Sequence, residues 1–267
     1  NNNPMELWVV DAFTTTPFKG NPAAVAIVNE FPSEKDMLSI AAEMNLSETC
    51  FVKVIKDERY HIRWFTPTVE VKLCGHATLA AAFVLKTCLK VTHPHLIFES
   101  LSGDLHVDVS EDRITMDFPS AECHEIPIDP AISHALGNIA VEAASTGPDA
   151  DSFLIYAYAS QSDIEALTPN SSALTEATPN AVIVTAPGDS DYDYALRVFA
   201  PQYGISEDPV TGSAQVLLAN FWKSRLNKPT FKATQASKRT GDLYVQHLGD
   251  TISIAGNAVL VSKVTFL

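Results

Sequence analysis

Two glycine-containing segments, each followed by an apolar run, carry residue types that could bind an anion. They are Cys74-Gly75-His76-Ala77-Thr78 and Glu207-Asp208-Pro209-Val210-Thr211-Gly212-Ser213-Ala214. The first N–H groups of a helix lack partners within it and carry partial positive charge. Because glycine permits close approach of the backbone, two such helix starts facing one cleft would bind a carboxylate. Alternatively, both segments are ordinary helix caps formed by Thr78, Thr211 and Ser213.

Three ionisable residues accompany these segments. Glu48 lies between a predicted helix and an apolar strand, where partial burial would raise its pKa and suit it to transfer a proton. His76 begins a helix whose dipole disfavours the imidazolium form, so neutral His76 could donate a hydrogen bond or relay a proton. Asp208 would be stabilised as an anion before the second helix. The structural alternatives are a solvated carboxylate, a capping or core histidine, and simple charge complementarity.

Cys74 offers a different chemistry, because a thiol near a helix N-terminus has a lowered pKa and could act as a base. A two-thiol racemase needs a second cysteine at the matching place, where Thr211 stands. The sequence therefore favours a buried, inert Cys74. His93-Pro94-His95 has no carboxylate or cysteine at ligand spacing, so we predict no metal. No nucleotide-binding or serine-hydrolase motif occurs, which argues against both of those classes of protein.

An internal repeat indicates how these residues are positioned. Residues 102–116 (SGDLHVDVSEDRITM) align without a gap on residues 240–254 (TGDLYVQHLGDTISI), at an offset of 138, and Gly75 matches Gly212 at an offset of 137. Two matches at nearly one offset indicate a duplicated architecture. We predict two homologous domains, residues 1–122 and 123–267. The last strand, predicted over residues 259–264, could pack back on the first domain.

The apolar runs 77–85 and 214–222 lack a polar face, so both helices must be buried on all sides. Further helices are predicted at 33–44, with Ser33 as N-cap, and at 132–136, 163–167 and 191–199. The strand signals are largely hairpin-spaced. The predicted fold is α+β, with each domain a mostly antiparallel or mixed sheet curled around a central helix.

Composition excludes several classes of partner. The 267 residues include 32 acidic and 18 basic side chains, giving a net charge of −14. This excess, without a Lys/Arg cluster, argues against binding to nucleic acid or to anionic membranes. No apolar run approaches the ~20 residues of a membrane span. Four scattered cysteines predict no disulfide framework, and we expect a cytoplasmic protein.

Together these segments resemble the phenazine-biosynthesis PhzF-like family of the diaminopimelate epimerase-like superfamily. The resemblance covers almost the whole chain. Besides the two segments above, its motifs are Val10-Asp11-Ala12-Phe13, Lys19-Gly20-Asn21-Pro22-Ala23, Asn45-Leu46-Ser47-Glu48-Thr49 and Arg63-Trp64-Phe65-Thr66-Pro67.

The resemblance implies two similar domains with the active site between them, cofactor-free chemistry and often a homodimer. It places the proton-carrying glutamate on Glu48, the histidine on His76 and the second carboxylate on Asp208. The family's substrate-carboxylate contacts fall on Gly75, Gly212 and Ser213, with Ser47 beside the glutamate. We also predict Thr211, which precedes Gly212, as a substrate-binding residue.

We therefore predict a cofactor-independent isomerase of a biosynthetic process that shifts a proton on a small carboxylate-bearing substrate. Glu48 is its expected acid/base. The alternatives are a single-thiol racemase or epimerase using Cys74, and a protein of the same fold that binds a ligand or partner without catalysis. The Cys74→Ala and Glu48→Gln variants would separate the two catalytic alternatives.

Overall fold

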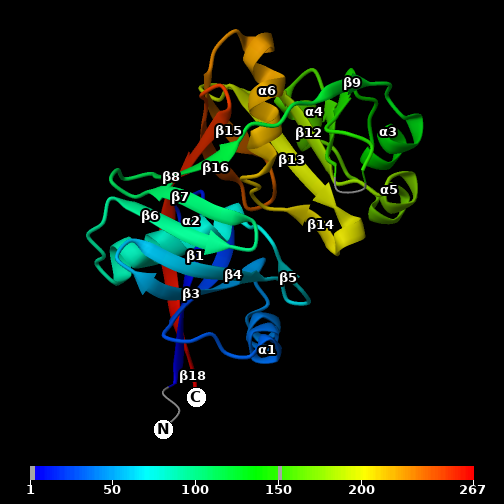
Figure 1. The fold of residues 1–267 in the computed structure, drawn as a ribbon. Helices are drawn as coiled ribbons and strands as arrows, with labels where there is room; N and C mark the ends of the chain where they lie inside the picture. The colour runs from blue at the N-terminus through cyan, green and yellow to red at the C-terminus, as the bar shows by residue number, and fades with distance from the viewer. Residues whose placement is uncertain (1–3, 150–151) are drawn as a thin grey trace. The chain divides into compact units, whose positions relative to one another are not determined.

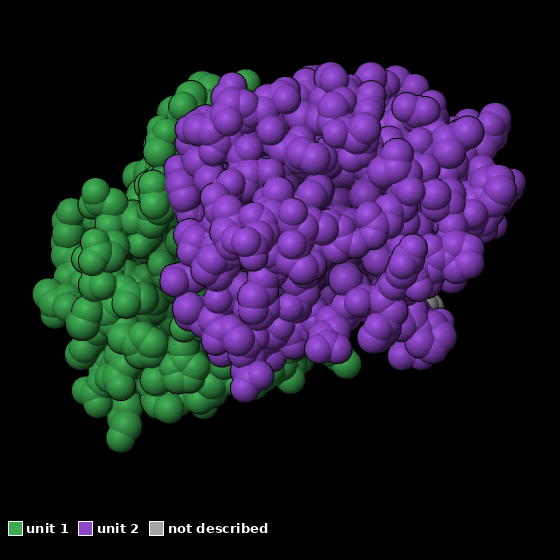
Figure 2. Space-filling view, turned by 90° about the horizontal axis from the view of Figure 1, so that it is seen from above, with its two compact units in different colours: residues 1–118, 253–267 green, residues 119–252 purple. Residues whose placement is uncertain are grey.

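The computed structural model describes residues 4–149 and 152–267, which form mixed α and β structure (Figure 1). The chain divides into two compact units, coloured separately in Figure 2. The first unit contains residues 1–118 and 253–267, and the second contains residues 119–252. The predicted domains meet between residues 122 and 123, and the predicted last strand, residues 259–264, lies in the first unit. Among the described helices, none is both long and apolar enough to span a membrane.

The first unit is a mixed β-sheet with helices packed on it. Strand β1 pairs antiparallel with both β18 and β2, which explains why the end of the chain belongs to this unit. Its elements are β1 (Met5–Ala12), β2 (Asn21–Val28), α1 (Glu34–Met44), β3 (Glu48–Lys56), β4 (Arg59–Phe65), β5 (Glu70–Val71), α2 (Gly75–Phe83), the π-helix η1 (Val84–Cys88), β6 (His95–Ser100), β7 (Gly103–Asp108), β8 (Ile114–Pro119) and β18 (Ala258–Phe266).

The second unit also contains paired strands, with more helices around them. Its elements are β9 (His124–Ile126), α3 (Pro130–Leu136), β10 (Glu142–Ser145), β11 (Leu154–Ala157), α4 (Gln161–Glu165), α5 (Ser171–Ala177), β12 (Val182–Pro187), β13 (Tyr194–Ala200), the 3₁₀-helix η2 (Pro201–Tyr203), β14 (Ile205–Asp208), α6 (Ala214–Leu226), β15 (Thr230–Gln235) and β16 (Gly241–His247). Strand β17 (Thr251–Gly256) contains the point where the chain passes from this unit to the first.

The two units repeat one order of strand pairing. In the first, β2 pairs parallel with β3, β3 antiparallel with β4, β4 parallel with β6, and β6 antiparallel with β7. In the second, β11, β12, β13, β15 and β16 show the same succession of parallel and antiparallel pairs. The short strands β5 and β14 pair antiparallel with β4 and β13, respectively. This order confirms the predicted fold class.

The helices α2 and α6 occupy equivalent places in this order, between β5 and β6 and between β14 and β15. Every residue of α2 from His76 to Ala82 is buried, as expected for a helix without a polar face. The opposite face of the first sheet carries α1, whose Met37 and Ala41 pack with Phe51 and Phe65. Sequence reasoning located both central helices because their apolar character is continuous.

One predicted helix is wrong. Residues 191–199, expected to be helical, contain most of strand β13. Tyr194 lies against Trp222 of α6, whereas Ala195 and Phe199 belong to the apolar cluster with α3, α4 and α5. A strand that is buried on both faces has no alternation of apolar and polar residues, so periodicity does not distinguish it from a buried helix. The helix predicted at 33–44 is confirmed, and the Ser33 side chain caps it by accepting from Asp36 N at 3.1 Å.

Candidate active site

Glu48 is the first residue of β3 and lies at the start of a buried strand. The preceding turn leaves α1 through Asn45 in the left-handed conformation and includes half-buried Ser47. Glu48 pairs in register with Ala23 of β2, and only 8% of Glu48 is exposed. Alternate residues of a strand share one face, so Glu48 lies on the same face as Cys50. That face is covered by α2, because the Cys50 thiol donates to the Ala77 carbonyl at 3.7 Å.

His76 lies in the first turn of α2 and is also buried. Burial lowers the pKa of His76 to about 3, against a smaller opposing effect of the Pro22 backbone. His76 is therefore neutral at physiological pH, as expected, although the main cause is burial. Its Nδ1 atom shares a 3.2 Å hydrogen bond with the Cys74 thiol, and its buried Nε2 has no hydrogen-bond partner among the described residues.

The start of β2 brings Glu48 and His76 into one region of the first unit. The Pro22 backbone acts on the His76 imidazole, since it opposes the lowering of the His76 pKa. The next residue, Ala23, pairs in register with Glu48. The charge of Glu48 also contributes, after burial, to the raised pKa of the Cys50 thiol. The first unit thus places Ser47, Glu48, Gly75 and His76 around the beginnings of β2, β3 and α2.

A tight loop supports this region. The buried side chain of Asp11, on β1, accepts a hydrogen bond from Phe18 N at 2.7 Å. Gly20 has a φ of +67°, and a Cβ there would lie 2.2 Å from the carbonyl oxygen of Ala12. Only glycine fits such a close approach. The loop therefore returns the chain directly into the β2 start beside Glu48.

The capping interpretation of the two helix starts is wrong for the three hydroxyl residues. The Thr78 hydroxyl donates to the Cys74 carbonyl at 2.7 Å and accepts from the Trp64 indole at 3.1 Å. Thr211 donates to the carboxylate Oδ2 of Asp208 at 2.6 Å. Ser213 stands at the N-cap position of α6 but makes no side-chain cap bond. The first N–H groups of α2 and α6 are therefore not occupied by these hydroxyls.

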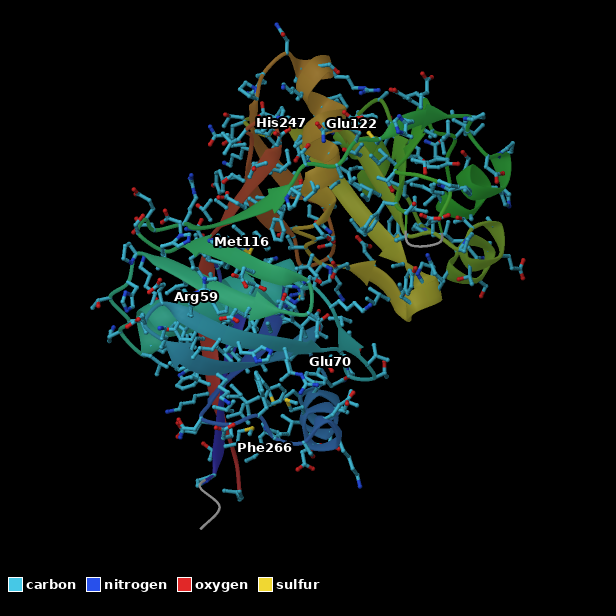
Figure 3. The ribbon with its side chains drawn as sticks, viewed as in Figure 1. Arg59, Glu70, Met116, Glu122, His247 and Phe266 are labelled. Atoms are coloured by element: carbon cyan, nitrogen blue, oxygen red, sulfur yellow. The ribbon has the colours of Figure 1, made fainter. Side chains whose placement is uncertain are left out.

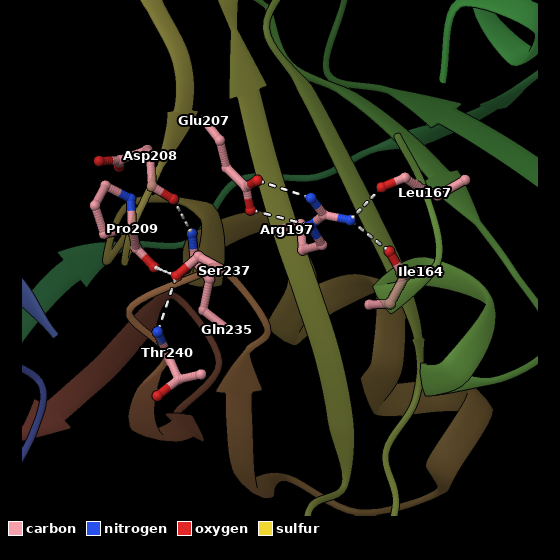
Figure 4. Close-up of polar contacts among 9 residues, drawn as sticks. All are labelled: Ile164, Leu167, Arg197, Glu207, Asp208, Pro209, Gln235, Ser237 and Thr240. Carbon is pink, nitrogen blue, oxygen red and sulfur yellow. Dashed lines mark hydrogen bonds and ion pairs between the residues drawn. The ribbon is translucent and has the colours of Figure 1, made fainter. Parts of the chain in front are cut away.

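Asp208 and Thr211 belong to a hydrogen-bonded segment between β14 and α6, shown in part in Figure 4. Two fully buried glutamines hold it. Gln235 accepts from Thr211 N at 2.7 Å and donates to the Asp208 carbonyl at 3.0 Å and to the Thr211 hydroxyl at 3.1 Å. Gln215 donates to the Thr211 carbonyl at 3.0 Å and accepts from the Tyr194 hydroxyl at 2.6 Å.

Sequence reasoning missed both glutamines. Gln215 is a polar residue inside the apolar run 214–222, and a polar residue in a buried helix indicates a buried hydrogen bond. Gln235 is the last residue of β15, whose sequence Thr-Phe-Lys-Ala-Thr-Gln matches no motif, so sequence alone gives no reason to single it out.

In each unit, an ion pair between an arginine and a glutamate fixes the short strand that precedes the central helix. In the first unit, Arg63 on β4 makes two 2.8 Å bonds to Glu70 on β5, which is labelled in Figure 3. In the second, Arg197 on β13 bonds Glu207 on β14 at 3.0 and 2.8 Å (Figure 4). Bidentate guanidinium–carboxylate pairs fix geometry as well as charge. Each therefore orients the chain that leads into α2 or α6.

The predicted residues thus fall into two groups, one in each unit. Ser47, Glu48, Gly75 and His76 belong to the first, and Asp208, Thr211, Gly212 and Ser213 belong to the second. Within the described residues, no group of three or more His, Cys, Asp or Glu side chains could hold a metal ion, and His93 and His95 therefore form no such group. The four cysteines are free thiols.

Comparison with known proteins places this arrangement in a family. The phenazine biosynthesis-like family, PhzC-PhzF, matches residues 10–264. The chain is 43% identical over 259 residues to an uncharacterized isomerase of Pseudomonas aeruginosa, covering 97% of each protein. It is 35% identical over 283 residues to a human phenazine biosynthesis-like domain-containing protein, covering 98% of each.

Solved structures agree with this match. The crystal structure of a PhzF-family phenazine biosynthesis protein from Enterococcus faecalis has a TM-score of 0.92 and 41% identity, covering 99% of this chain and 100% of the other. A hydroxyproline epimerase from Agrobacterium vitis, with a TM-score of 0.61 and 11% identity, shares the fold. The match over nearly the whole chain, with relatives named as isomerases, shows that this chain is an isomerase of the phenazine biosynthesis-like family.

Proposed function

We propose that the protein is a cofactor-independent isomerase in which Glu48 moves a proton between two positions of a small carboxylate-bearing substrate. The observation that carries this proposal is that a buried carboxyl group at the start of β3 and a buried, neutral imidazole in the first turn of α2 both lie next to the start of β2. In the first step, the C–H bond breaks and the proton passes to Glu48. Glu48 then returns the same proton to another atom, so the reaction needs no oxidant and no co-reactant.

The start of α2 supplies the charge that such a reaction requires. The Thr78 N–H donates to the Cys74 carbonyl, and the N–H groups of Gly75, His76 and Ala77 before it have no acceptor within the helix. These groups and the helix dipole stabilise a carboxylate and the negative charge that develops when a proton is removed. The neutral His76 would hydrogen-bond the substrate through Nε2 without adding a charge.

In the second unit, we propose that Asp208 orients the substrate or carries a second proton. Thr211, Gly212 and Ser213 would bind its polar groups at the start of α6. The support is the hydrogen-bonded Asp208–Thr211 pair and the absence of a side-chain cap at Ser213.

We also propose, from the family resemblance, that the protein is a homodimer. Sedimentation of the purified protein would test this proposal.

A second candidate is a single-thiol racemase or epimerase, favoured by the 3.2 Å contact between Cys74 Sγ and His76 Nδ1. In that reaction the thiolate would remove the proton, with His76 as its partner. Thr211 stands where a two-thiol enzyme would need its second cysteine. Comparison of Glu48→Gln with Cys74→Ala separates the two candidates.

The test is deuterium uptake from D₂O by a panel of small amino, hydroxy and cyclic carboxylates, read by mass spectrometry. We expect Glu48→Gln to reduce uptake by about 100-fold or more, because the amide cannot accept the proton. Glu43→Gln is the matched control, since Glu43 is an exposed glutamate of the neighbouring helix α1, and it should retain wild-type uptake. Full activity of Glu48→Gln with loss in Cys74→Ala would transfer the role to the thiol. Compounds that bind without uptake in the wild type would identify a binding protein.

A further inference from the structure

We infer that Gln235 is a positioning residue for Asp208, because it fixes the direction in which the Thr211 hydroxyl donates its proton. The structure shows these hydrogen bonds whether or not the protein has the proposed activity. The consequence for catalysis rests on the proposed function, in which Asp208 takes part in the reaction.

The orientation of the Gln235 amide is determined by two backbone groups. Thr211 N–H can only donate, so the atom that faces it at 2.7 Å is the carbonyl oxygen Oε1. The Asp208 carbonyl can only accept, so the atom that faces it at 3.0 Å is Nε2. The reversed amide would place two donors together and two acceptors together. Only one orientation therefore satisfies both groups.

This orientation controls the Thr211 hydroxyl. Nε2 of Gln235 also donates to Thr211 Oγ1 at 3.1 Å, so the hydroxyl oxygen is an acceptor on that side. Its own proton must point elsewhere, and Asp208 Oδ2 lies 2.6 Å away. A hydrogen bond donated to a carboxylate favours the ionised form. Gln235 thus favours ionised Asp208 through Thr211, without itself bonding the carboxylate.

The surrounding contacts keep the chain of hydrogen bonds rigid. Gln235 and Gln215 are both fully buried, where hydrogen bonds are stronger than in water. Gln215 holds the Thr211 carbonyl, and Tyr194 holds Gln215. The N–H and C=O groups of Thr211 are therefore both fixed by glutamine side chains, and the hydroxyl has little freedom to turn away from Asp208.

The first unit lacks this arrangement at the equivalent position. Tyr194 pairs in register with Ala233, two residues before Gln235, and its counterpart Tyr60 pairs with Phe98, two residues before Ser100. The Ser100 hydroxyl donates to the Gly103 carbonyl in its own hairpin at 2.8 Å. The glutamine thus occurs in the unit that contains the second proposed carboxylate, Asp208.

The test is the titration of the Asp208 carboxyl carbon, followed by NMR in the whole protein labelled with ¹³C-aspartate and assigned with Asp208→Asn. We expect Gln235→Met and Thr211→Val each to shift the titration to higher pH. In the Thr211→Val background, Gln235→Met should cause no additional shift, because Gln235 acts through the hydroxyl. Thr211→Ser, which keeps the hydroxyl, should restore the wild-type titration.

Gln246→Met is the matched control, because Gln246 is an exposed glutamine on the neighbouring strand β16 and should leave the titration unchanged. If Gln235→Met does not fold, Gln235→Glu replaces the donor with an acceptor and should give a larger upward shift. Two results would overturn the inference. One is an unchanged Asp208 titration in the folded Gln235 variant, and the other is a Gln235→Met shift of equal size with and without the Thr211→Val substitution.

The activity readout separates this inference from the proposed function. With a substrate found by deuterium uptake, Gln235→Met should lose about tenfold in kcat/KM on the acidic limb of the pH profile, and recover as the pH rises. A merely structural defect would lower the whole profile. If Glu48→Gln proves fully active, the proposed function fails, but the NMR titration still decides the role of Gln235.

Discussion

At the scale of single residues, the burial of His76 has a thermodynamic consequence. The folded protein lowers the pKa of His76 from its ordinary 6.5 to about 3. Between these two pH values, the unfolded chain binds a proton at this residue and the folded protein does not. The free energy of unfolding must therefore decrease as the pH falls from about 6.5 towards 3, by up to about 1.4 kcal/mol per pH unit from this group.

His76→Gln should remove this contribution. We expect the free energy of unfolding of the wild type to fall between pH 7 and pH 5 by about 2 kcal/mol more than that of the variant. Urea unfolding at the two pH values measures the difference, and all other titrating groups are shared by both proteins. The same pH dependence in both would mean that His76 accepts a proton in the folded protein, and the neutral role proposed for it would be untenable.

At the scale of elements, the two ion pairs before the central helices provide an internal comparison. The Arg63 guanidinium bonds Glu70 and contacts the rings of Phe31 and Phe65. Arg197, besides bonding Glu207, donates to the carbonyls of Ile164 and Leu167 at 2.8 and 2.9 Å. Arg197 therefore joins β13, β14 and the end of α4, and a lysine could not make these bonds together.

We predict that Arg197→Lys lowers the free energy of unfolding by about 1–2 kcal/mol more than Arg63→Lys does, because two further hydrogen bonds are lost. Chemical denaturation of both variants at one pH gives this difference directly, and each arginine acts as the control for the other. Equal losses would show that the carbonyl contacts of Arg197 contribute no net stability.

The elements also show what a sequence can and cannot reveal. The runs that form α2 and α6 were predictable because they are apolar on every side. Their starts were predictable from the glycine that precedes or begins each run. Strand β13 was not, because burial on both faces removes the alternation that identifies a strand. The contacts of Gln235 depend on β15 lying beside the segment before α6, which only the folded chain establishes.

At the scale of the whole molecule, the two units differ in how the chain builds them. The second unit is one continuous stretch, residues 119–252, whereas the first requires residues 253–267 from the end of the chain. Strand β18 covers the edge of β1 along its whole length, from Met5 paired with Phe266 to Ala12 paired with Ala258. Without β18, the edge of β1 would expose unpaired backbone N–H and C=O groups.

We therefore predict that residues 119–252 fold when expressed alone, and that residues 1–118 do not. Circular dichroism and cooperative thermal unfolding of the two fragments measure this, since a compact unit with its own core is expected to fold independently. Joining residues 253–267 to residue 118 through a flexible linker should restore folding of the first fragment, because it returns β18 to β1. A cooperative transition in residues 1–118 without that strand would show that β18 is dispensable. Failure of residues 119–252 to fold would mean that the second unit requires the first.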